Sequence, residues 1–339
     1  MFGDKKIIIY SNADGACSYY RSVLPYNFLK QHTKYISLSE QIPKEISLSS
    51  IYHDIFMFQR PLQSFLHKEF IPYCKSKGKK VICDVDDNLF VLPEYNEAKA
   101  VYESNNALYD HAMNLAKANF ITCSTVPLAE YIKRNFNPNT LVIPNRLQEF
   151  FPYKETEHIE NKLVKIGYSG SVTHIGDFSD TLIKYLIKRI NQKKIEFVCF
   201  GCCPKPLRDI STIVPYCKLD QYYPTLNNLH FDIGLIITKD NEFNVNKSNL
   251  KYIEYSMLSI PTIADSVYPY SNSIVHNESG LLVKDEMNWE IYIDHLIENK
   301  AERKRLSKNA YNFVRKNFYY RTNEKEIIDL YSQLYRRIT

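Results

Sequence analysis

Short hydrophobic runs alternate with longer amphipathic stretches along the first half of the chain. The short runs are rich in Ile, Val and Phe, which favours buried strands, whereas the longer stretches repeat their apolar residues every three or four positions, which favours helices. We predict strands at residues 6–10, 55–58, 80–84, 120–123 and 140–143. Helices are predicted at residues 19–30, 62–76, 105–118 and 127–135.

The alternation stops at a proline-bearing, increasingly charged segment, residues 151–162, which we interpret as a linker. Beyond it, strands are predicted at residues 164–168, 195–199, 232–237, 262–264 and 280–283, and helices at 177–192, 221–229, 248–259, 287–298 and 300–317. Alternation of strands and helices is typical of parallel sheets covered by helices. The sequence therefore predicts an α/β fold with two domains, residues 1–150 and 163–318, that face each other across a cleft.

The composition excludes some classes of protein. With 45% hydrophobic and 24% charged residues, the chain has the composition of an ordinary globular protein rather than a disordered one. No apolar run approaches the roughly 18 residues that would span a bilayer, and the start of the chain lacks a signal-peptide cleavage site. We therefore expect a cytoplasmic protein. The eight cysteines lack the spacing of a zinc site and are expected to be free thiols.

The net charge of +5 permits anionic partners, such as nucleotide phosphates or a lipid surface, but does not identify one. A more specific signal lies around the helix predicted at 248–259. There Glu254, Lys247 and Lys251 fall on one flank beside an apolar stripe, and Ser248 is a plausible N-cap. Ammonium groups at a helix start suit a diphosphate, and a carboxylate farther along suits ribose hydroxyls. The alternative is a solvated face with a Lys251–Glu254 salt bridge.

The run that begins at Lys247, KSNLKYIEYSMLSIPTIADSVYPYSNSIVHNESGLLV, resembles the donor-binding signature of retaining glycosyltransferases with the GT-B fold (glycosyltransferase group 1, family 4-like). The resemblance implies the GT-B architecture: two Rossmann-like domains, and a C-terminal helix, here residues 319–339, that crosses back to the first domain. It implies that Glu254 binds the ribose of a nucleotide sugar. Asn246 stands where relatives carry a second glutamate that contacts the sugar.

Two further stretches of the second half agree with this family in order. IGYSGSVTHIGDF resembles the strand and turn that open the donor domain, where Gly170 and Ser171 would let the chain approach a phosphate. His174 stands near the position where relatives place a basic residue, and it is a candidate donor to phosphate. In VPYCKLDQYYPTLNNLHFDIGLIIT, the resemblance places Tyr216 where it could stack on the nucleotide base.

In the first half, SNADGACSYYRSVLP resembles the loop that reaches across the cleft toward the donor phosphates. Gly15 would allow a tight turn, and Arg21 would pair with a phosphate or with acceptor charge. The acidic run CDVDDNLF contains Asp86, for which an acceptor-side or structural role is expected, with metal binding as the alternative. The resemblance implies that neither a metal nor another cofactor is required.

These expectations combine into one function. The chain would transfer a sugar from a nucleotide-diphosphate sugar to a hydroxyl of a glycan, glycolipid or modified-DNA acceptor, and the commonest such role is bacterial surface polysaccharide synthesis, with possible peripheral contact at the inner membrane face. Lys247, Lys251 and Arg21 would stabilise the departing diphosphate, with Asp86 on the acceptor side. A phage-type DNA-base glycosyltransferase, a sugar-nucleotide epimerase and a non-catalytic subunit remain alternatives. The sequence does not indicate the oligomeric state.

Overall fold

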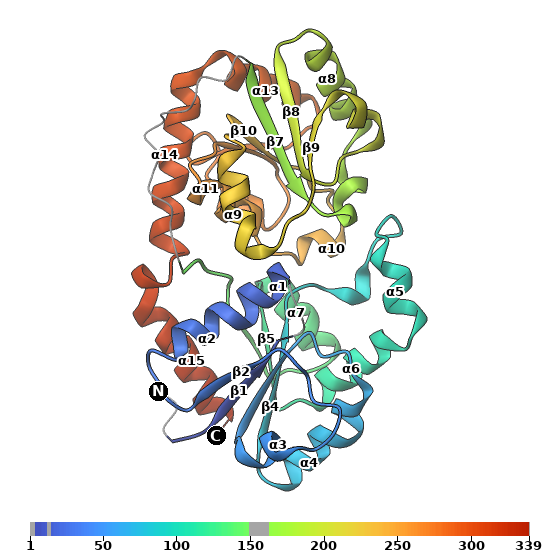
Figure 1. Cartoon of the computed structure of the whole chain (residues 1–339), viewed down its shortest axis with the longest axis vertical. Helices are drawn as coiled ribbons and strands as arrows, with labels where there is room; N and C mark the ends of the chain where they lie inside the picture. The colour runs from blue at the N-terminus through green and yellow to red at the C-terminus, as the bar shows by residue number, and fades with distance from the viewer. Residues whose placement is uncertain (1–3, 12–14, 149–162, 339) are drawn as a thin grey trace.

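The computed structural model of the chain describes residues 4–11, 15–148 and 163–338. Within them, two six-stranded sheets form the centres of two lobes, one above the other in Figure 1. We call the described residues up to 148 the N-terminal lobe and residues 163–317 the C-terminal lobe. The predicted linker, 151–162, falls outside the described residues, so the predicted domain boundaries stay predictions.

The sheet of the N-terminal lobe has the strand order β2-β1-β3-β4-β5-β6, and all its pairings are parallel. Its strands are β1 (Ile7–Tyr10), β2 (Ile36–Ser39), β3 (Ile55–Gln59), β4 (Lys80–Val85), β5 (Phe120–Cys123) and β6 (Thr140–Val142). The connections contain α1 (Ala16–Ser18), η1 (Tyr19–Val23), α2 (Leu24–Leu29), α3 (Leu48–Tyr52), η2 (Leu66–Phe70), α4 (Ile71–Ser76), η3 (Leu89–Val91), α5 (Ala98–Ser104), α6 (Ala107–Lys117) and α7 (Val126–Asn135). The strands β1, β3 and β5 are buried along their whole length because helices cover both faces of the sheet.

The sheet of the C-terminal lobe has the order β12-β11-β10-β7-β8-β9 and is also parallel throughout. Its strands are β7 (Val164–Gly170), β8 (Ile195–Gly201), β9 (Thr212–Val214), β10 (Ile233–Ile236), β11 (Thr262–Asp265) and β12 (Leu281–Val283). Its helices are η4 (Val172–Asp177), α8 (Asp180–Asn191), η5 (Lys205–Ile210), α9 (Leu219–Asn228), α10 (Glu242–Val245), α11 (Leu250–Met257), α12 (Tyr270–Ser273), α13 (Met287–Glu298) and α14 (Lys300–Asn317).

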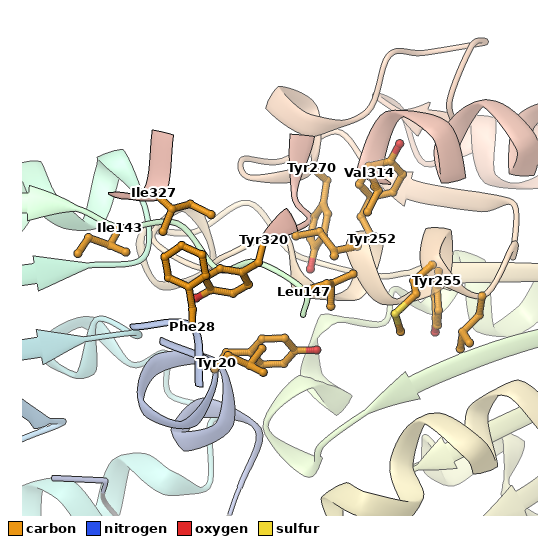
Figure 2. Close-up of a cluster of buried hydrophobic side chains, with 14 of the residues drawn as sticks. Tyr20, Phe28, Ile143, Leu147, Tyr252, Tyr255, Tyr270, Val314, Tyr320 and Ile327 are labelled. Atoms are coloured by element: carbon orange, nitrogen blue, oxygen red, sulfur yellow. The ribbon is translucent and has the colours of Figure 1, made fainter. Parts of the chain in front are cut away.

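The chain then returns to the N-terminal lobe. After α14 and the short turn η6 (Arg321–Asn323), the last helix, α15 (Glu324–Ile338), lies beside α2 and the first sheet (Figure 1). Its residues Ile327, Tyr331 and Leu334 belong to a hydrophobic cluster that also contains Ile7 and Ile9 of β1. Figure 2 shows that this cluster continues through Tyr20, Phe28 and Tyr320 toward the C-terminal lobe. The predicted return of the C-terminal helix is confirmed.

The structure adds elements that the hydrophobic pattern did not predict. The strands β2 and β9 lie at sheet edges, and their residues are partly or fully exposed, so they lack a continuous apolar run. The helices α3 and α5 are short and largely exposed, and they show no apolar stripe of useful length. All the predicted strands agree with the structure to within a few residues, and α13 and α14 have the predicted bounds.

The contact of α15 with the first sheet leads to a stability prediction. Leu334 is 3% exposed and, with Tyr331, closes a small apolar cavity over Ile7, Ile9 and Met57. We expect Leu334→Ala to lower the free energy of unfolding by about 2–4 kcal/mol, since it removes buried methyl groups and enlarges a cavity. Urea denaturation measures this. Gln333→Ala, at an exposed position of the same helix, should be neutral; equal effects of the two changes would contradict the packing.

Candidate functional site

A cavity of about 540 Å³ lies between the two lobes. Its walls come from residues at or beyond the carboxyl ends of strands in both sheets, and from the start of α11. All the predicted site residues except Asn246 line it, namely Gly15, Arg21, Asp86, Gly170, Ser171, His174, Tyr216, Lys247, Ser248, Lys251 and Glu254. Carboxyl edges of parallel sheets are the usual position of ligands in open α/β folds, because helix N-termini point there.

Glu254 lies on α11 at the buried end of this cavity and is 6% exposed. Its Oε1 accepts a hydrogen bond from the Tyr20 hydroxyl at 2.8 Å, and its Oε2 accepts one from the Tyr222 hydroxyl at 3.0 Å. Burial raises the pKa of Glu254 to about 7, although hydrogen bonding and the nearby Lys251 ammonium act in the opposite direction. The carboxylate is therefore ionised only in part at neutral pH.

Two ammonium groups lie on the same wall. The Lys251 ammonium lies 4.8 Å from the centre of the Tyr168 ring. Burial, together with the charge of Lys247, lowers the pKa of Lys251 to about 8. Lys247 lies over the Phe243 ring at 4.5 Å. Both cations are thus held beside aromatic faces, which attract them, and are partly desolvated before any anion arrives.

His174 keeps Lys247 in place rather than presenting a free N–H to the cavity. Its Nδ1 donates to the Asp177 carboxylate at 3.0 Å, and its Nε2 faces the Lys247 ammonium at 3.3 Å. Burial, together with Lys247 and Lys251, lowers the pKa of His174 to about 3, so the ring is neutral and its Nε2 is an acceptor. The predicted donation from His174 to a phosphate does not fit this arrangement.

Two predictions about the start of α11 are wrong. Ser248 is not the N-cap, because α11 begins at Leu250 and Asn249 precedes it; the Ser248 hydroxyl instead accepts a hydrogen bond from Asn145 at 3.1 Å. Asn246 does not reach the cavity. Because α10 forms just before it, Asn246 turns inward. There its side-chain amide donates to the backbone carbonyl of Glu242, and its backbone carbonyl accepts a hydrogen bond from the Thr125 hydroxyl.

Arg21 also has a partner other than the predicted phosphate. Its guanidinium is buried and forms a two-pronged ion pair with Asp84, at 2.9 and 2.6 Å. It also donates to the Ile143 carbonyl and to the Asn145 side chain. Because these four hydrogen bonds tie η1 to β4 and to the chain after β6, Arg21 organises the N-terminal wall rather than binding a mobile anion.

Asp86 is paired in a similar way. The Arg60 guanidinium contacts both of its oxygens, at 3.1 and 2.6 Å. Burial acts to raise the pKa of Asp86, but this ion pair outweighs it and lowers the pKa to about 2. Asp87 lies beside the pair, 3.5 Å from Arg60, and forms an ion pair with Lys247 of the C-terminal lobe at 3.7 Å. The N-terminal wall therefore presents carboxylates to the C-terminal wall's ammonium groups.

Cys17, Asp86 and Asp87 bring ligand atoms within 4.8 Å of one another, which is a spacing that a metal ion could use. Their chemistry fits a metal poorly. Burial raises the pKa of the Cys17 thiol well above its ordinary value, so it is not the thiolate that a metal prefers. Both oxygens of Asp86 are already engaged by Arg60.

The remaining predicted residues lie along the C-terminal wall and the opposite loop. Gly170 ends β7, and the Ser171 hydroxyl pairs with that of Thr173. Gly201, whose φ is +102°, approaches so closely that a Cβ would lie 2.5 Å from the Gly170 carbonyl and against the Tyr216 ring. Tyr216 thus packs over Gly201 and is 52% exposed. Gly15 lies just before α1 at the cavity mouth. The assigned roles of these residues stay predictions.

Sequence reasoning missed Tyr20, Tyr222 and Arg60. A tyrosine carries little signal in a chain that has 27 of them. Arg60 directly follows β3, and its left-handed backbone (φ 47°) was not visible in the sequence. One signal could have indicated Arg60. It is a basic residue at the carboxyl end of a predicted strand, and an acidic run lies at the end of the next predicted strand.

No known family model and no curated protein matches the chain by sequence. Solved structures match it along almost its whole length. HepE of Anabaena in complex with UDP-glucose superposes with a TM-score of 0.67 at 10% identity, over 97% of this chain and 100% of HepE. The sucrose-phosphate synthase of Thermosynechococcus elongatus gives 0.66 at 14% identity, over 98% and 99%. A glycosyltransferase of Rickettsia africae gives 0.62 at 13%, over 99% of both chains.

The chain has the GT-B fold. The match covers both lobes and the returning C-terminal helix, and the predicted architecture is confirmed. At such low identity the GT-B fold specifies the position of the cleft, whereas the chemistry in the cleft must be argued from the side chains that line it.

The raised pKa of Glu254 leads to a prediction about stability. A carboxyl group whose pKa is higher in the folded chain makes its stabilising contribution at low pH and loses it as the pH rises from about 4.5 through 7. Glu254→Gln cannot ionise. We therefore expect the variant to gain about 2.5 kcal/mol of unfolding free energy relative to wild type between about pH 5 and about pH 8.5.

Urea denaturation at the two pH values measures this gain. Glu298→Gln, on the exposed part of α13, is the matched control and should keep the pH dependence of the wild type. Parallel stability curves for Glu254→Gln and the wild type would show that Glu254 does not titrate in this range.

Proposed function

We propose that this GT-B chain is a glycosyltransferase that moves a sugar from a nucleotide-diphosphate sugar to an acceptor hydroxyl. The observation that carries the proposal is the wall formed by α11 and the residues just before it. Within one cavity of the cleft it combines a buried carboxylate, Glu254, with two ammonium groups, Lys247 and Lys251. A ribose and a diphosphate need these two kinds of group side by side.

Glu254 would accept hydrogen bonds from the two ribose hydroxyls. Lys247 and Lys251, together with the first free N–H groups of α11, would neutralise the diphosphate. Neutral His174 would hold Lys247 toward the phosphates by accepting from its ammonium. Tyr216, which is exposed and lines the same cavity, would stack on the base.

The structural neighbours support this assignment. HepE has been solved with UDP-glucose and with UDP and glucose. TarM of S. aureus, which matches 83% of this chain over 55% of its own length with a TM-score of 0.57 at 14% identity, has been solved with UDP, fondaparinux and alpha-GlcNAc-glycerol. These ligands are a nucleotide, sugars and glycosides, which correspond to the donor and acceptor that we propose.

In this proposal, catalysis consists mainly of stabilising the charge on the departing diphosphate and of positioning the acceptor. Lys247 and Lys251 supply the charge, whereas Arg21 acts only through its hold on the N-terminal wall. We propose a retaining reaction, as the sequence resemblance implies, in which a donor phosphate oxygen takes the acceptor proton on the face of the leaving group. Such a reaction requires no protein nucleophile and no metal. Asp86 and Asp87 would face the acceptor.

For the acceptor we propose a hydroxyl of a glycan or glycolipid, in bacterial surface polysaccharide synthesis. Asp87 lies in the cleft opposite Lys247, where a carboxylate can accept a hydrogen bond from a sugar hydroxyl. No helix among the described residues is both long and apolar enough to cross a membrane. We propose that a lipid-linked acceptor is met at the membrane surface.

The experiment that tests the proposed function is a thermal-shift screen of the wild-type chain against UDP-, GDP-, dTDP- and CMP-sugars. We expect one nucleotide class to raise the melting temperature, because a ligand that binds only the folded state stabilises it. Release of the nucleotide over time would then show turnover. If no nucleotide sugar shifts the transition, the proposed function is wrong.

The lowered pKa of Lys251 gives a sharper prediction about the same site. We expect Lys251→Met to raise the Kd of the stabilising nucleotide sugar by about 10- to 100-fold, since a charge-assisted hydrogen bond to phosphate is lost. The wild type should also take up a proton on binding at about pH 8.5, because the diphosphate raises a lysine pKa that starts at about 8. Titration calorimetry in two buffers of different ionisation enthalpy measures both quantities.

The matched control for that experiment is Lys304→Met, at an exposed position of α14, which should bind and take up protons like the wild type. Proton uptake that persists in Lys251→Met would assign the titration to another group and would argue against Lys251 as a phosphate ligand.

A further inference from the structure

The two oxygens of Glu254 are held from opposite lobes. Tyr222 belongs to α9 of the C-terminal lobe, the lobe that carries Glu254 itself. Tyr20 belongs to η1 of the N-terminal lobe, and 234 positions separate it from Glu254 in sequence. The carboxylate proposed to bind the donor ribose is therefore also a contact between the lobes.

Tyr20 is rigidly placed for this contact. It is 1% exposed and meets the Tyr19 ring edge-on at 5.4 Å. Figure 2 shows its ring within the hydrophobic cluster, with the hydroxyl pointing away from Phe28 of its own lobe. The neighbouring Arg21, bound to Asp84 and Asn145, fixes the same turn of η1. The Tyr20 hydroxyl thus comes from a firmly packed element and not from a mobile loop.

The two tyrosines leave room for a ligand on the same carboxylate. An ionised carboxylate offers about four acceptor positions on its two oxygens. Tyr20 and Tyr222 take one position on each oxygen, at 2.8 and 3.0 Å, and Tyr223 also lies within hydrogen-bonding reach of the carboxylate. The remaining acceptor capacity can serve a ribose hydroxyl, and the tyrosine hydrogen bonds decide where it points.

We infer that Tyr20 is a positioning residue that acts through Glu254 and couples donor binding to the contact between the lobes. The inference rests on the proposed function, since it takes Glu254 as the ribose ligand. When the lobes are in contact, Tyr20 orients the carboxylate for the ribose. By linkage, a bound donor that prefers the oriented carboxylate strengthens the contact between Tyr20 and Glu254.

The charges around Glu254 decide whether loss of the Tyr20 hydroxyl raises or lowers the ionised fraction of Glu254. Among the titratable groups near Glu254, Lys251 carries the positive charge that favours its ionisation, and the others are tyrosines. These groups are Tyr20 from η1, Tyr216 from the segment before α9, Tyr222 and Tyr223 from α9, Tyr270 from α12, and Lys251 and Tyr255 from α11. Hydroxyl donors favour the charged form of a carboxyl group. Loss of the Tyr20 hydroxyl would leave Glu254 both less ionised and less well oriented near neutral pH.

Other contacts between the lobes do not depend on Tyr20. Asn145 donates to Ser248, Thr125 donates to the carbonyl of Asn246, and Asp87 faces Lys247. Removal of the Tyr20 hydroxyl alone should therefore leave the lobes in contact while it uncouples Glu254 from that contact.

The experiment compares two variants that each lose one hydrogen bond to the same carboxylate, Tyr20→Phe and Tyr222→Phe. The probe is whichever of UDP, GDP and dTDP stabilises the wild type. We expect Tyr20→Phe to raise the Kd of this nucleotide by about ten-fold near pH 7. The increase should be smaller at about pH 8.5, where Glu254 is ionised in both the variant and the wild type. Tyr222→Phe should also weaken binding. Titration calorimetry measures each affinity.

The two variants should differ in how the nucleotide affects the N-terminal lobe. In the wild type and in Tyr222→Phe, bound nucleotide should slow hydrogen exchange across α2, which follows Tyr20 and contributes Phe28 to the same cluster. In Tyr20→Phe this protection should be lost. A Tyr20→Phe chain with wild-type affinity, tighter binding or unchanged protection would overturn the inference.

Glu254→Ala, which removes the acceptor, completes the test. In this background, Tyr20→Phe should cause no further loss of affinity, because the two residues act through one contact; additive losses would also overturn the inference. If Tyr20→Phe does not fold, Glu254→Ala alone, at saturating nucleotide, should still remove the nucleotide-dependent protection of α2. A wild type that binds none of the nucleotides would instead refute the proposed function, and the wild-type measurement alone shows this.

Discussion

The structure depends on a carboxylate that is buried where two parallel sheets present their carboxyl edges to each other. Glu254 is almost excluded from water, yet it is surrounded by hydroxyl groups and a single nearby ammonium rather than by a full ion pair. A buried carboxyl group in such surroundings is ionised only with difficulty. The carboxylate therefore has acceptor capacity that the hydroxyl groups of a bound ligand could use.

The other charges of the cleft follow a different principle. Arg21 is neutralised by Asp84, and Asp86 is neutralised by Arg60. The buried charges of the N-terminal wall therefore stabilise the structure of that wall. The C-terminal wall keeps Lys247 and Lys251 beside aromatic rings, without a close carboxylate partner on their own lobe. This division of charge makes the C-terminal wall the one that is prepared for an anion.

The lobes are also joined by contacts that lie directly at the cavity. Tyr20, Asn145 and Asp87 all reach from the N-terminal lobe to the segment that carries Lys247, Ser248 and Glu254. The segment that we propose to bind the donor therefore also takes part in the arrangement of the lobes. In a GT-B protein the two processes can then influence each other through single hydrogen bonds instead of through a separate hinge mechanism.

The sequence by itself determined the two-sheet architecture, most strands, and the placement of Lys251 and Glu254 on one helix, with Lys247 just before that helix. These features depend on local periodicity, which the order of apolar and polar residues encodes directly. Edge strands such as β2, with partly exposed residues, could not be recognised in that way.

Only the tertiary structure decided the partners of the site residues. Arg21 pairs with Asp84 across 63 positions, and Tyr20 meets Glu254 across 234. The inward turn of Asn246 and the pairing of Ser248 with Asn145 likewise depend on how the N-terminal lobe packs against α11. Hydrogen bonds between distant residues follow from the packing of whole elements, and a pattern read along one segment contains no information about what will lie opposite it.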